Sequence, residues 1–301
     1  MGVMDRHSKL LVIGDVAWDV VMRPAGDLVW ASDVYGRVDL LPGGSAANVA
    51  VWATRLGAAA RLVGKVGDDH FGRMMREHLR TEGLEAGLVE APGEQTTRIG
   101  VVIRADGEHA FVTDHSDPLR LGPADLPIEL LDGVALVFLN GYAVFMAGSP
   151  GFAAGLLDEA RRRRIAVAFD PSSFSLIRRY GGQRLLQGLG RLDLLLANEE
   201  EAAALLGLPD GAEPSELSPL LEFAETVVVK RGPRGAAALT QGGWTRSAAE
   251  EARVVDTMGA GDAFDAAFLA ARLGGASLDE ALTRGNHLGA HVATRLGAQT
   301  P

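Results

Sequence analysis

Residues 256–264 read DTMGAGDAF, a run in which three small residues stand directly before an aspartate. Because Gly259, Ala260 and Gly261 carry no bulky side chain, their backbone N–H groups can approach an anion closely. The following segment, AFDAAFLAARL, has the apolar spacing that predicts a helix, with Asp262 at its start. Two interpretations stay open: Asp262 caps the helix, or it is a reactive carboxylate beside an anion-binding turn.

The overall composition narrows the classes of function. The chain has 301 residues, 39 of them acidic and 29 basic, and a formal net charge of −10, so we expect no nucleic-acid partner. It contains no cysteine, which excludes disulfides and fits a cytoplasmic location. The first apolar run, LLVIGDVAWDVV at residues 10–21, is short and interrupted by Asp15 and Asp19. We therefore expect neither a signal peptide nor a membrane span.

Short apolar runs alternate with helical patterns along most of the chain. This alternation predicts an α/β fold with a central, mainly parallel sheet between helices. The expected strands are residues 10–13, 134–139, 165–169, 192–197 and 226–229, and the expected helices are residues 45–56, 71–80, 151–163, 199–206 and 263–273, with a last helix starting at Ser277. The length suits one large domain, which we expect to span residues 1–301.

Two early segments depart from this alternation. Residues 99–104 and 109–113 flank an Asp106-Gly107 pair, which is a strong hairpin-turn signal, and residues 34–41 form another extended stretch. Insertions near 34–41 and 97–114 therefore predict a small β-sheet apart from the main one. A lid over a binding site and ordinary edge strands are both compatible with this pattern.

A second glycine-rich turn, PGGS at residues 42–45, precedes a predicted helix that carries Asn48. Gly43 and Gly44 let the backbone approach a ligand, and Asn48 offers both a donor and an acceptor to hydroxyl groups. Asp19 is a third polar group near the first strand. A tight turn and a surface aspartate remain the alternative. The sequence has no Walker A motif and no GxGxxG after the first strand, so phosphate would have to bind at another kind of turn.

Two longer motifs resemble those of one enzyme family. GGSAANVAVWATRLGA at residues 43–58 resembles the amino-terminal signature of the ribokinase-like (PfkB) family of carbohydrate kinases, and DTMGAGDAFDAAF at residues 256–268 resembles its carboxy-terminal signature. Three segments between them are also similar to family segments: VGKVGDDHFG at 63–72, NEEE at 198–201 and VVVKRGPRGAAAL at 227–239. The resemblance covers nearly the whole chain and implies a ribokinase-like three-layer core with a small β-sheet lid.

The resemblance implies transfer of the γ-phosphoryl group of ATP to an alcohol, with Mg²⁺ as the cofactor. Asp262 would be the base that takes the hydroxyl proton, and the amides of Gly259, Ala260 and Gly261 would bind the charge on the phosphoryl group. Because a helix N-terminus favours the ionised carboxylate, we expect Asp262 to be a weak base. The residues that would contact the substrate are Asp19, Gly43, Gly44, Asn48 and Arg98.

A further group of residues matches the nucleotide side of the family. Asn198 and Glu201 resemble its NxxE motif and would help to hold magnesium and the phosphates, mostly through water. Asn198 can also cap a helix, and both roles are compatible. The other residues at nucleotide positions are Lys230, Gly232, Gly235 and Asn286. For Lys230, an ordinary solvated lysine at a strand end is the alternative.

The sequence differs from the family pattern at Asp265 and in its carboxy-terminal segment. Asp265 stands where relatives commonly carry Asn, Gly or another small residue, so we expect its charge to affect the substrate side. TRLGAQTP at residues 294–301 resembles a segment that in some relatives binds a monovalent cation together with residues around Asp256. Because the sequence stops at Pro301, a complete K⁺ site is in doubt, and activation by K⁺ stays open.

The resemblance leaves the phosphoryl acceptor open. A small sugar with a primary hydroxyl is the favoured substrate, and a nucleoside is the alternative because Trp18, Tyr35 or Phe111 could stack on a base. A catalytically inactive relative that only binds a ligand is a third hypothesis, and the intact GAGD motif argues against it. A lid of few strands leaves one face uncovered, so we expect a homodimer formed through the lid.

Overall fold

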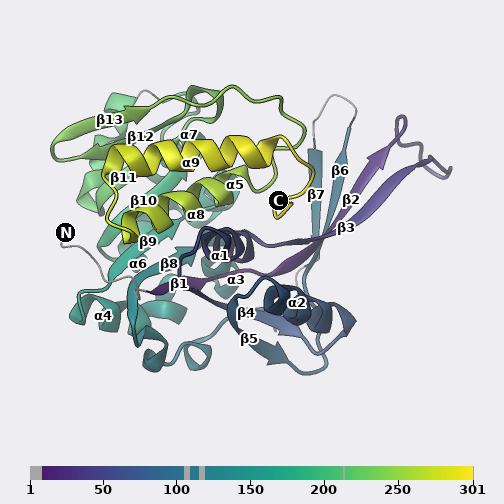
Figure 1. Ribbon diagram of the computed structural model, residues 1–301, viewed down its shortest axis with the longest axis horizontal. Coiled ribbons are helices and arrows are strands. Elements are labelled where there is room, and N and C mark those ends of the chain that lie inside the picture. The colour runs from purple at the N-terminus through teal and green to yellow at the C-terminus, as the bar shows by residue number, and fades with distance from the viewer. Residues whose placement is uncertain (1–8, 105–108, 115–118, 213, 301) are drawn as a thin grey trace.

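The computed structural model describes residues 9–104, 109–114, 119–212 and 214–300. They form a nine-stranded sheet between two layers of helices, with a separate four-stranded sheet beside it (Figure 1). The large sheet consists of β1 (Lys9–Ile13), β4 (Ala60–Gly67), β5 (Glu85–Ala91), β8 (Val134–Asn140), β9 (Ala166–Asp170), β10 (Leu192–Asn198), β11 (Ala224–Lys230), β12 (Ala236–Thr240) and β13 (Gly243–Ser247). The predicted α/β architecture, with a central, mainly parallel sheet and a separate small sheet, is confirmed.

The large sheet is mainly parallel and changes winding direction beside β1. Its strands run in the order β13-β12-β11-β10-β9-β8-β1-β4-β5, and only β12 and β13 are antiparallel to their neighbours. The chain extends the sheet from β1 through β4 to β5 on one side and from β8 to β11 on the other. Such a switch point leaves a crevice at the carboxyl ends of the strands, where ligands bind in open α/β sheets.

Helices cover both faces of this sheet. One face packs against α1 (Ser45–Arg55), α2 (His70–Thr81), α8 (Ala260–Leu273) and α9 (Leu278–Ala293), and the other packs against α3 (Gly141–Ala147), α4 (Ala154–Arg162), α5 (Phe174–Tyr180), α6 (Gly182–Leu189) and α7 (Glu199–Leu206). Alternate residues of β1 belong to the two cores: Leu10 and Val12 to the first, Leu11 and Ile13 to the second. Burial on both faces explains the continuous apolar runs in the sequence.

The four-stranded sheet, called the small sheet below, stands apart from the core. It runs in the order β3-β2-β6-β7 and consists of β2 (Ala17–Pro24), β3 (Gly36–Gly43), β6 (Arg98–Ile103) and β7 (His109–Asp114). The β2–β3 hairpin reaches away from the body of the molecule in Figure 1. β3 and the antiparallel pair β6–β7 match the two predicted insertions, and the Asp106-Gly107 turn lies outside the described residues.

Several elements were not expected from the sequence. β2, β4, β5, β12 and β13 carry polar residues or small residues within their apolar pattern, and α3, α5 and α6 are only seven or eight residues long. Such short elements give weak periodic signals and depend on tertiary contacts. The predicted helix at residues 151–163 begins later, at Ala154, after a 3₁₀ turn at Pro150–Ala153. In the described ranges, none of the helices is both long and apolar enough to cross a membrane.

Candidate active site

A cavity of about 440 Å³ opens at the carboxyl ends of the central strands. Asp15 follows β1, while Asp170, Asn198 and Lys230 are the last residues of β9, β10 and β11, and all four line the cavity. The start of α8 contributes Gly259, Gly261 and Asp262, and the small sheet contributes Asp19, Ile99, Phe111 and Thr113. The fold therefore brings most of the sequence-predicted site residues into one crevice.

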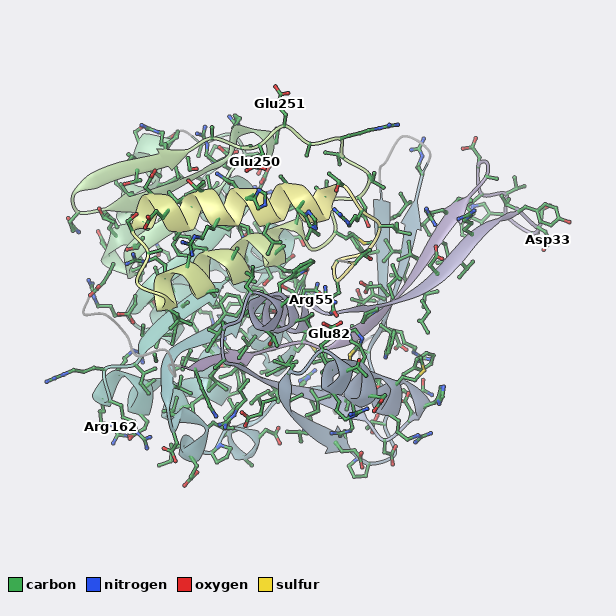
Figure 2. The ribbon with its side chains drawn as sticks, viewed as in Figure 1. Asp33, Arg55, Glu82, Arg162, Glu250 and Glu251 are labelled. Carbon is green, nitrogen blue, oxygen red and sulfur yellow. The ribbon has the colours of Figure 1, made fainter. Side chains whose placement is uncertain are left out.

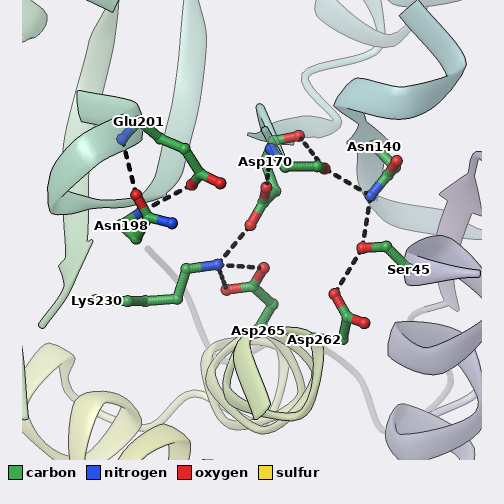
Figure 3. A network of polar contacts seen from close by, with 9 residues as sticks. Ser45, Asn140, Asp170, Asn198, Glu201, Lys230, Asp262 and Asp265 are labelled. Atoms are coloured by element: carbon green, nitrogen blue, oxygen red, sulfur yellow. Dashed lines mark hydrogen bonds and ion pairs between the residues drawn. The ribbon is translucent and has the colours of Figure 1, made fainter. Parts of the chain in front are cut away.

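Asp262 lies in the first turn of α8 and is not the helix cap. The N-cap position is Gly259, at φ 73°, and it has no side chain to bond to the helix. The Asp262 carboxylate instead accepts hydrogen bonds from α1, through Ser45 Oγ at 2.6 Å and Asn48 Nδ2 at 2.7 Å (Figure 3 shows the Ser45 contact). The interpretation of Asp262 as a simple helix cap is therefore wrong.

The electrostatic surroundings of Asp262 also differ from the sequence expectation. Burial raises the pKa of Asp262 to about 6, although the hydrogen bonds from Ser45 and Asn48 lower it. Loss of hydration thus outweighs the helix N-terminus, which by itself would favour the ionised form. We expected Asp262 to be a weak base, but a pKa of about 6 makes it a stronger base than an ordinary aspartate.

Ser45 and Asn140 support Asp262 and were not identified from the sequence. Asn140, fully buried at the end of β8, donates through Nδ2 to Ser45 Oγ at 2.8 Å and to Ser172 Oγ at 2.9 Å (Figure 3). Its Oδ1 accepts from the backbone of Tyr142 at 2.9 Å. With Asn140 donating to its oxygen, the Ser45 hydroxyl proton is directed at Asp262. The only sequence signals were a serine after paired glycines and a polar residue closing an apolar strand.

The turn before Asp262 has the form of an anion cradle. In the described chain, the N–H groups of Gly261 and Asp262 have no acceptor within the protein, as expected for the first turn of a helix. A Cβ placed on Gly259 would lie 2.3 Å from Ala298 Cβ, so both its positive φ and its surroundings require glycine. A Cβ on Gly261 would come 3.6 Å from Lys230 Nζ, which places this ammonium beside the cradle.

Lys230 is held by two carboxylates and is not an ordinary exposed lysine. Its Nζ lies 2.5 Å from Asp170 Oδ2 and 3.1 Å from both oxygens of Asp265 (Figure 3). Burial lowers the pKa of Lys230, but the charges of Asp170 and Asp265 raise it by more than burial lowers it. The net shift of the pKa is therefore upward, and the ammonium stays charged. Burial also raises the pKa of Asp265. Asp265 pairs with Lys230 and does not line the cavity, and the expectation that its charge affects the substrate side stays a prediction.

The predicted substrate residues gather at the small-sheet end of the cavity. Asp19 lies on β2, and its carboxylate comes within 2.3 Å of the position that a Cβ on Gly43 would take. Burial and, next, the charge of Asp15 raise the pKa of Asp19 to about 7. Gly44, at φ 91°, is the N-cap of α1, and Asn48 is 4% exposed, with its amide bonded at both ends. Gly44, Asn48 and Asp19 line the cavity.

Asn198 and Glu201 line the opposite end of the cavity and also cap α7. Glu201 N donates to Asn198 Oδ1 at 2.7 Å, and Asn198 N donates to Glu201 Oε2 at 2.8 Å (Figure 3). Burial and the nearby Asp170 raise the pKa of Glu201 to about 7. Capping and exposure to the cavity are thus combined in the same two residues. Gly232, at φ 53°, also lines the cavity.

Comparisons with known proteins identify the family of this chain. The sequence model of the pfkB family carbohydrate kinases matches residues 7–301. The chain belongs to the PfkB family. Fructokinase-1 of Oryza sativa subsp. japonica is 30% identical, with 98% of this chain and 95% of that protein aligned. The ATP-dependent ribose-1-phosphate kinase of Halopiger xanaduensis is 31% identical, with 97% and 94% aligned.

The solved structures support the same fold. The crystal structure of adenosine kinase from Sinorhizobium meliloti superposes with a TM-score of 0.86 at 24% identity, covering 98% of this chain and 96% of that one. The suspected PfkB relationship is confirmed, and the protein is an ATP-dependent phosphotransferase of this family. The family is that of the carbohydrate kinases, and the relatives differ in the substrates that their names give.

Some residues predicted from the PfkB resemblance lie away from the cavity wall. Asn286 donates through Nδ2 to the carbonyls of Ser247 at 3.1 Å and Ala248 at 3.0 Å. A Cβ on Gly235 would lie 2.1 Å from the Ser247 carbonyl, so this glycine is needed for close packing. Arg98, at the start of the inner strand β6, binds Asp114 of β7 at 2.6 Å. Their predicted ligand contacts remain predictions.

Asp256 binds two backbone amides in front of the cradle. Its Oδ1 accepts from Met258 N and its Oδ2 from Gly297 N, both at 3.0 Å. The carboxylate thereby ties the carboxy-terminal segment to the loop that leads into α8. Among the described residues, no group of three or more His, Cys, Asp or Glu side chains is arranged to hold a metal ion.

The three aromatic residues considered for base stacking have different positions. Trp18 is 6% exposed, and its Nε1 donates to the Phe71 carbonyl at 3.0 Å, so it belongs to the core. Tyr35 is 91% exposed near the tip of the β2–β3 hairpin. Phe111 lines the cavity. Of the three, Phe111 alone belongs to the cavity wall.

Proposed function

We propose that this PfkB kinase transfers the γ-phosphoryl group of ATP to a hydroxyl, preferably a primary one, of a small uncharged sugar, with Asp262 as the base. One observation carries the proposal: a carboxylate with a pKa of about 6 lies in the cavity, next to the unpaired amides of Gly261 and Asp262. At pH 7 a group with this pKa is about nine-tenths ionised. It is therefore ready to accept a proton.

The chain supplies the three functions that phosphoryl transfer requires. Ser45 and Asn48 hold the Asp262 carboxylate toward the cavity, where it accepts the proton of the attacking hydroxyl. The amides of Gly261 and Asp262 bind the charge on the phosphoryl oxygens. Lys230, kept charged by its two carboxylates, adds a cation beside them. Because the transition state is loose, alignment and charge stabilisation supply most of the catalysis.

ATP and Mg²⁺ are expected for the family, and the residues present fit them. Asn198, Glu201 and Gly232 line the end of the cavity beyond Lys230 and would face the nucleotide. Their hard oxygen donors suit a cation that keeps several waters and binds the phosphates. Mg²⁺ would neutralise charge on the β- and γ-phosphates. Gly235 and Asn286 would then support the nucleotide site indirectly, because they hold β12, β13 and α9 together.

The charges of the cavity wall favour an uncharged acceptor. Asp15, Asp19 and Asp262 are acidic, and among the described lining residues Lys230 is the single cation. Lys230 belongs to the phosphate end, so a phosphorylated sugar or a sugar acid would meet carboxylates without a cation to balance its charge. Asp19, Gly44 and Asn48 would hold neutral hydroxyl groups, and Gly43 leaves room for the Asp19 carboxylate. Arg98, at the start of β6, does not line the cavity, and its contact with the substrate stays a prediction.

A nucleoside is the second candidate, and a specific observation favours it. Ile99, Phe111, Tyr142 and Met146 add apolar surface to the same cavity, and a base could pack against them. The adenosine kinase with the same fold is consistent with such a substrate. The ribose hydroxyls of a nucleoside would use the same Asp19 and Asn48 contacts as a free sugar.

The test is ADP release with ATP and Mg²⁺ over a panel of acceptors, with Asp262→Asn as the background. The panel contains pentoses, ketohexoses, ribose 1-phosphate, 2-keto sugar acids and nucleosides. We expect turnover of a neutral pentose or ketohexose. Turnover confined to nucleosides would replace the sugar by the second candidate, and turnover confined to the anionic sugars would refute the charge argument.

A homodimer through the small sheet is a further part of the proposal. Asp19, Ile99 and Thr113 are cross-strand neighbours that line the cavity, so the alternate residues point to the opposite face. On that face Val38 is 69% exposed, Leu40 40% and Val112 73%. A sheet face this apolar is better covered by a second copy of itself than left in water. Light scattering at micromolar concentration should give twice the chain mass, and a monomer mass would contradict it.

Two remaining expectations belong with this function. A cytoplasmic location would give the enzyme access to ATP. Asp256 is the candidate group for a monovalent cation, and its bonds to Met258 and Gly297 connect it to the loop that leads into the cradle. The role of K⁺ is tested by comparing the rate of phosphoryl transfer in KCl with the rate in tetramethylammonium chloride at equal ionic strength. Equal rates would remove K⁺ from the proposal.

A further inference from the structure

The carboxy-terminal segment at residues 297–300 is fastened beside the cavity by contacts from α1 and the loop before α8. Gly297 N donates to Asp256, and Trp52 Nε1 donates to the Ala298 carbonyl at 2.8 Å. Arg55 Nη1 donates to the Gln299 carbonyl at 2.6 Å. Arg55 itself forms two hydrogen bonds with Glu82, at 2.8 and 2.6 Å, and Figure 2 labels this pair between α1 and α2. The Gln299 backbone is therefore held in place independently of its side chain.

The side chain of Gln299 joins α2 to the proposed base. Gln299 Nε2 donates to Asn48 Oδ1 at 2.8 Å, and Asn48 Nδ2 donates to Asp262 at 2.7 Å. On its other side, Gln299 Oε1 lies 2.7 Å from His78 Nε2. Gln299 and Asn48 are each 4% exposed, so water does not readily replace these bonds. Three consecutive hydrogen bonds thus run from His78 to Asp262.

The polarity of this chain of bonds is determined from its two ends. An ionised carboxylate can only accept, so Asn48 must present its amide NH₂ to Asp262 and its oxygen to Gln299. Gln299 must then present its own NH₂ to Asn48 and its oxygen to His78. His78 has to donate from Nε2, which the neutral Nε2–H tautomer and the protonated ring both do. Reversing any one amide places two acceptors or two donors against each other.

We propose that Gln299 is a positioning residue that, with His78, fixes the amide orientation of Asn48 and so directs a hydrogen-bond donor at Asp262. This inference rests on the proposed role of Asp262 as the base. It assigns to a residue at the chain's carboxy-terminal end a part in the chemistry, although Gln299 does not line the cavity. Its effect passes entirely through Asn48.

The proposal predicts the direction in which the pKa of Asp262 changes when the Asn48 hydrogen bond is weakened. The Asn48 hydrogen bond lowers the pKa of Asp262, opposing the larger effect of burial. Weakening or reversing that bond should therefore raise the pKa further and move the acidic limb of the rate profile to higher pH. The other charged or titratable groups that face Asp262 are Asp19, Tyr142, Asp170 and Lys230. Arg55 and Glu82 lie near His78, and all six stay in place in the variants.

The experiment compares Gln299→Glu and Gln299→Met with Gln187→Glu, a change on the exposed face of α6 that adds the same charge. The pKa of Asp262 is measured without substrate from its carboxyl ¹³C resonance, assigned by its loss in Asp262→Asn. We expect it to rise by about half a unit to one unit in Gln299→Glu, where two acceptors meet, and by less in Gln299→Met. The kcat for the acceptor found in the panel should fall on the order of tenfold, with KM for ATP within about twofold. Gln187→Glu should match the wild type.

A second pair of variants covers the case in which Gln299 changes prevent folding. His78→Phe removes the donor at the partly exposed end of the chain of bonds, whereas His78→Gln keeps one. We expect the pKa of Asp262 to rise in His78→Phe and to recover in His78→Gln. Lower melting temperatures with an unchanged Asp262 titration would reduce Gln299 to a structural role and overturn the inference. Wild-type turnover in Asp262→Asn would refute the base instead, and the resonance would still test the orientation.

Discussion

Replacing Asp262 by asparagine should remove activity and stabilise the protein at the same time. The substitution keeps the volume and a hydrogen-bonding amide, but it removes the group that accepts the proton. We expect kcat to fall on the order of a hundredfold or more, with ATP affinity retained. The loss of a negative charge beside the phosphates acts in the direction of tighter ATP binding.

The stabilisation follows from the pKa of Asp262. It rises from 3.8 to about 6 on folding, so between these values the folded state binds more protons than the unfolded state, and stability falls as pH rises. At about 1.4 kcal/mol per pH unit, ionising Asp262 in the fold costs at most about 3 kcal/mol above pH 6. Water in the cavity reduces this value, and we expect about 1–2 kcal/mol. For a chain of this length, this corresponds to a melting temperature roughly 2–3 °C higher at pH 7.5.

The assay pairs turnover with thermal unfolding at pH 7.5 and pH 4. The matched control is Asp279→Asn, which removes an exposed aspartate from the first turn of α9 and should change neither activity nor stability appreciably. The stability gain of Asp262→Asn should be nearly absent at pH 4, where the wild-type residue is protonated in the fold. Near wild-type turnover would refute Asp262 as the base. An inactive variant that is less stable at pH 7.5 would refute the argument from burial.

Three further predictions follow from the site. Lys230→Met leaves Asp170 and Asp265 buried without their cation and should destabilise the fold by about 3 kcal/mol in urea unfolding while raising KM for ATP; an unchanged unfolding free energy would contradict the ion-pair geometry. Gly259→Ala should lower kcat at least tenfold because its Cβ would strike Ala298, whereas Gly275→Ala, at a similar φ of 83° with open space around it, should keep full activity. Val112→Glu should convert the proposed dimer into a monomer by light scattering, with Glu129→Gln as an exposed control; an unchanged mass would exclude this face.

The sequence alone determined the local features of the fold. Apolar runs buried on both faces predicted the central strands, and residues such as Ser277 and Asn198 predicted helix starts, because each of these signals acts between near neighbours in the chain. The glycines at 44 and 259 were recognisable because their positive φ values are intrinsic to the turns that they form. Short or partly polar elements such as β4 and α5 were missed because their stability comes from tertiary packing.

Only the tertiary structure decided how the site works. Ser45 and Asp262 are 217 residues apart in sequence, and Gln299 and Asn48 are 251 residues apart, so neither hydrogen bond leaves a local signal. The proton affinity of Asp262 depends on burial by distant elements, which reversed the expectation drawn from its helix position. Lys230 and Asp265 were visible as charges, but their pairing required β11 and α8 to meet. Electrostatics depends on distance in space and on access of water, and the folded chain alone sets both.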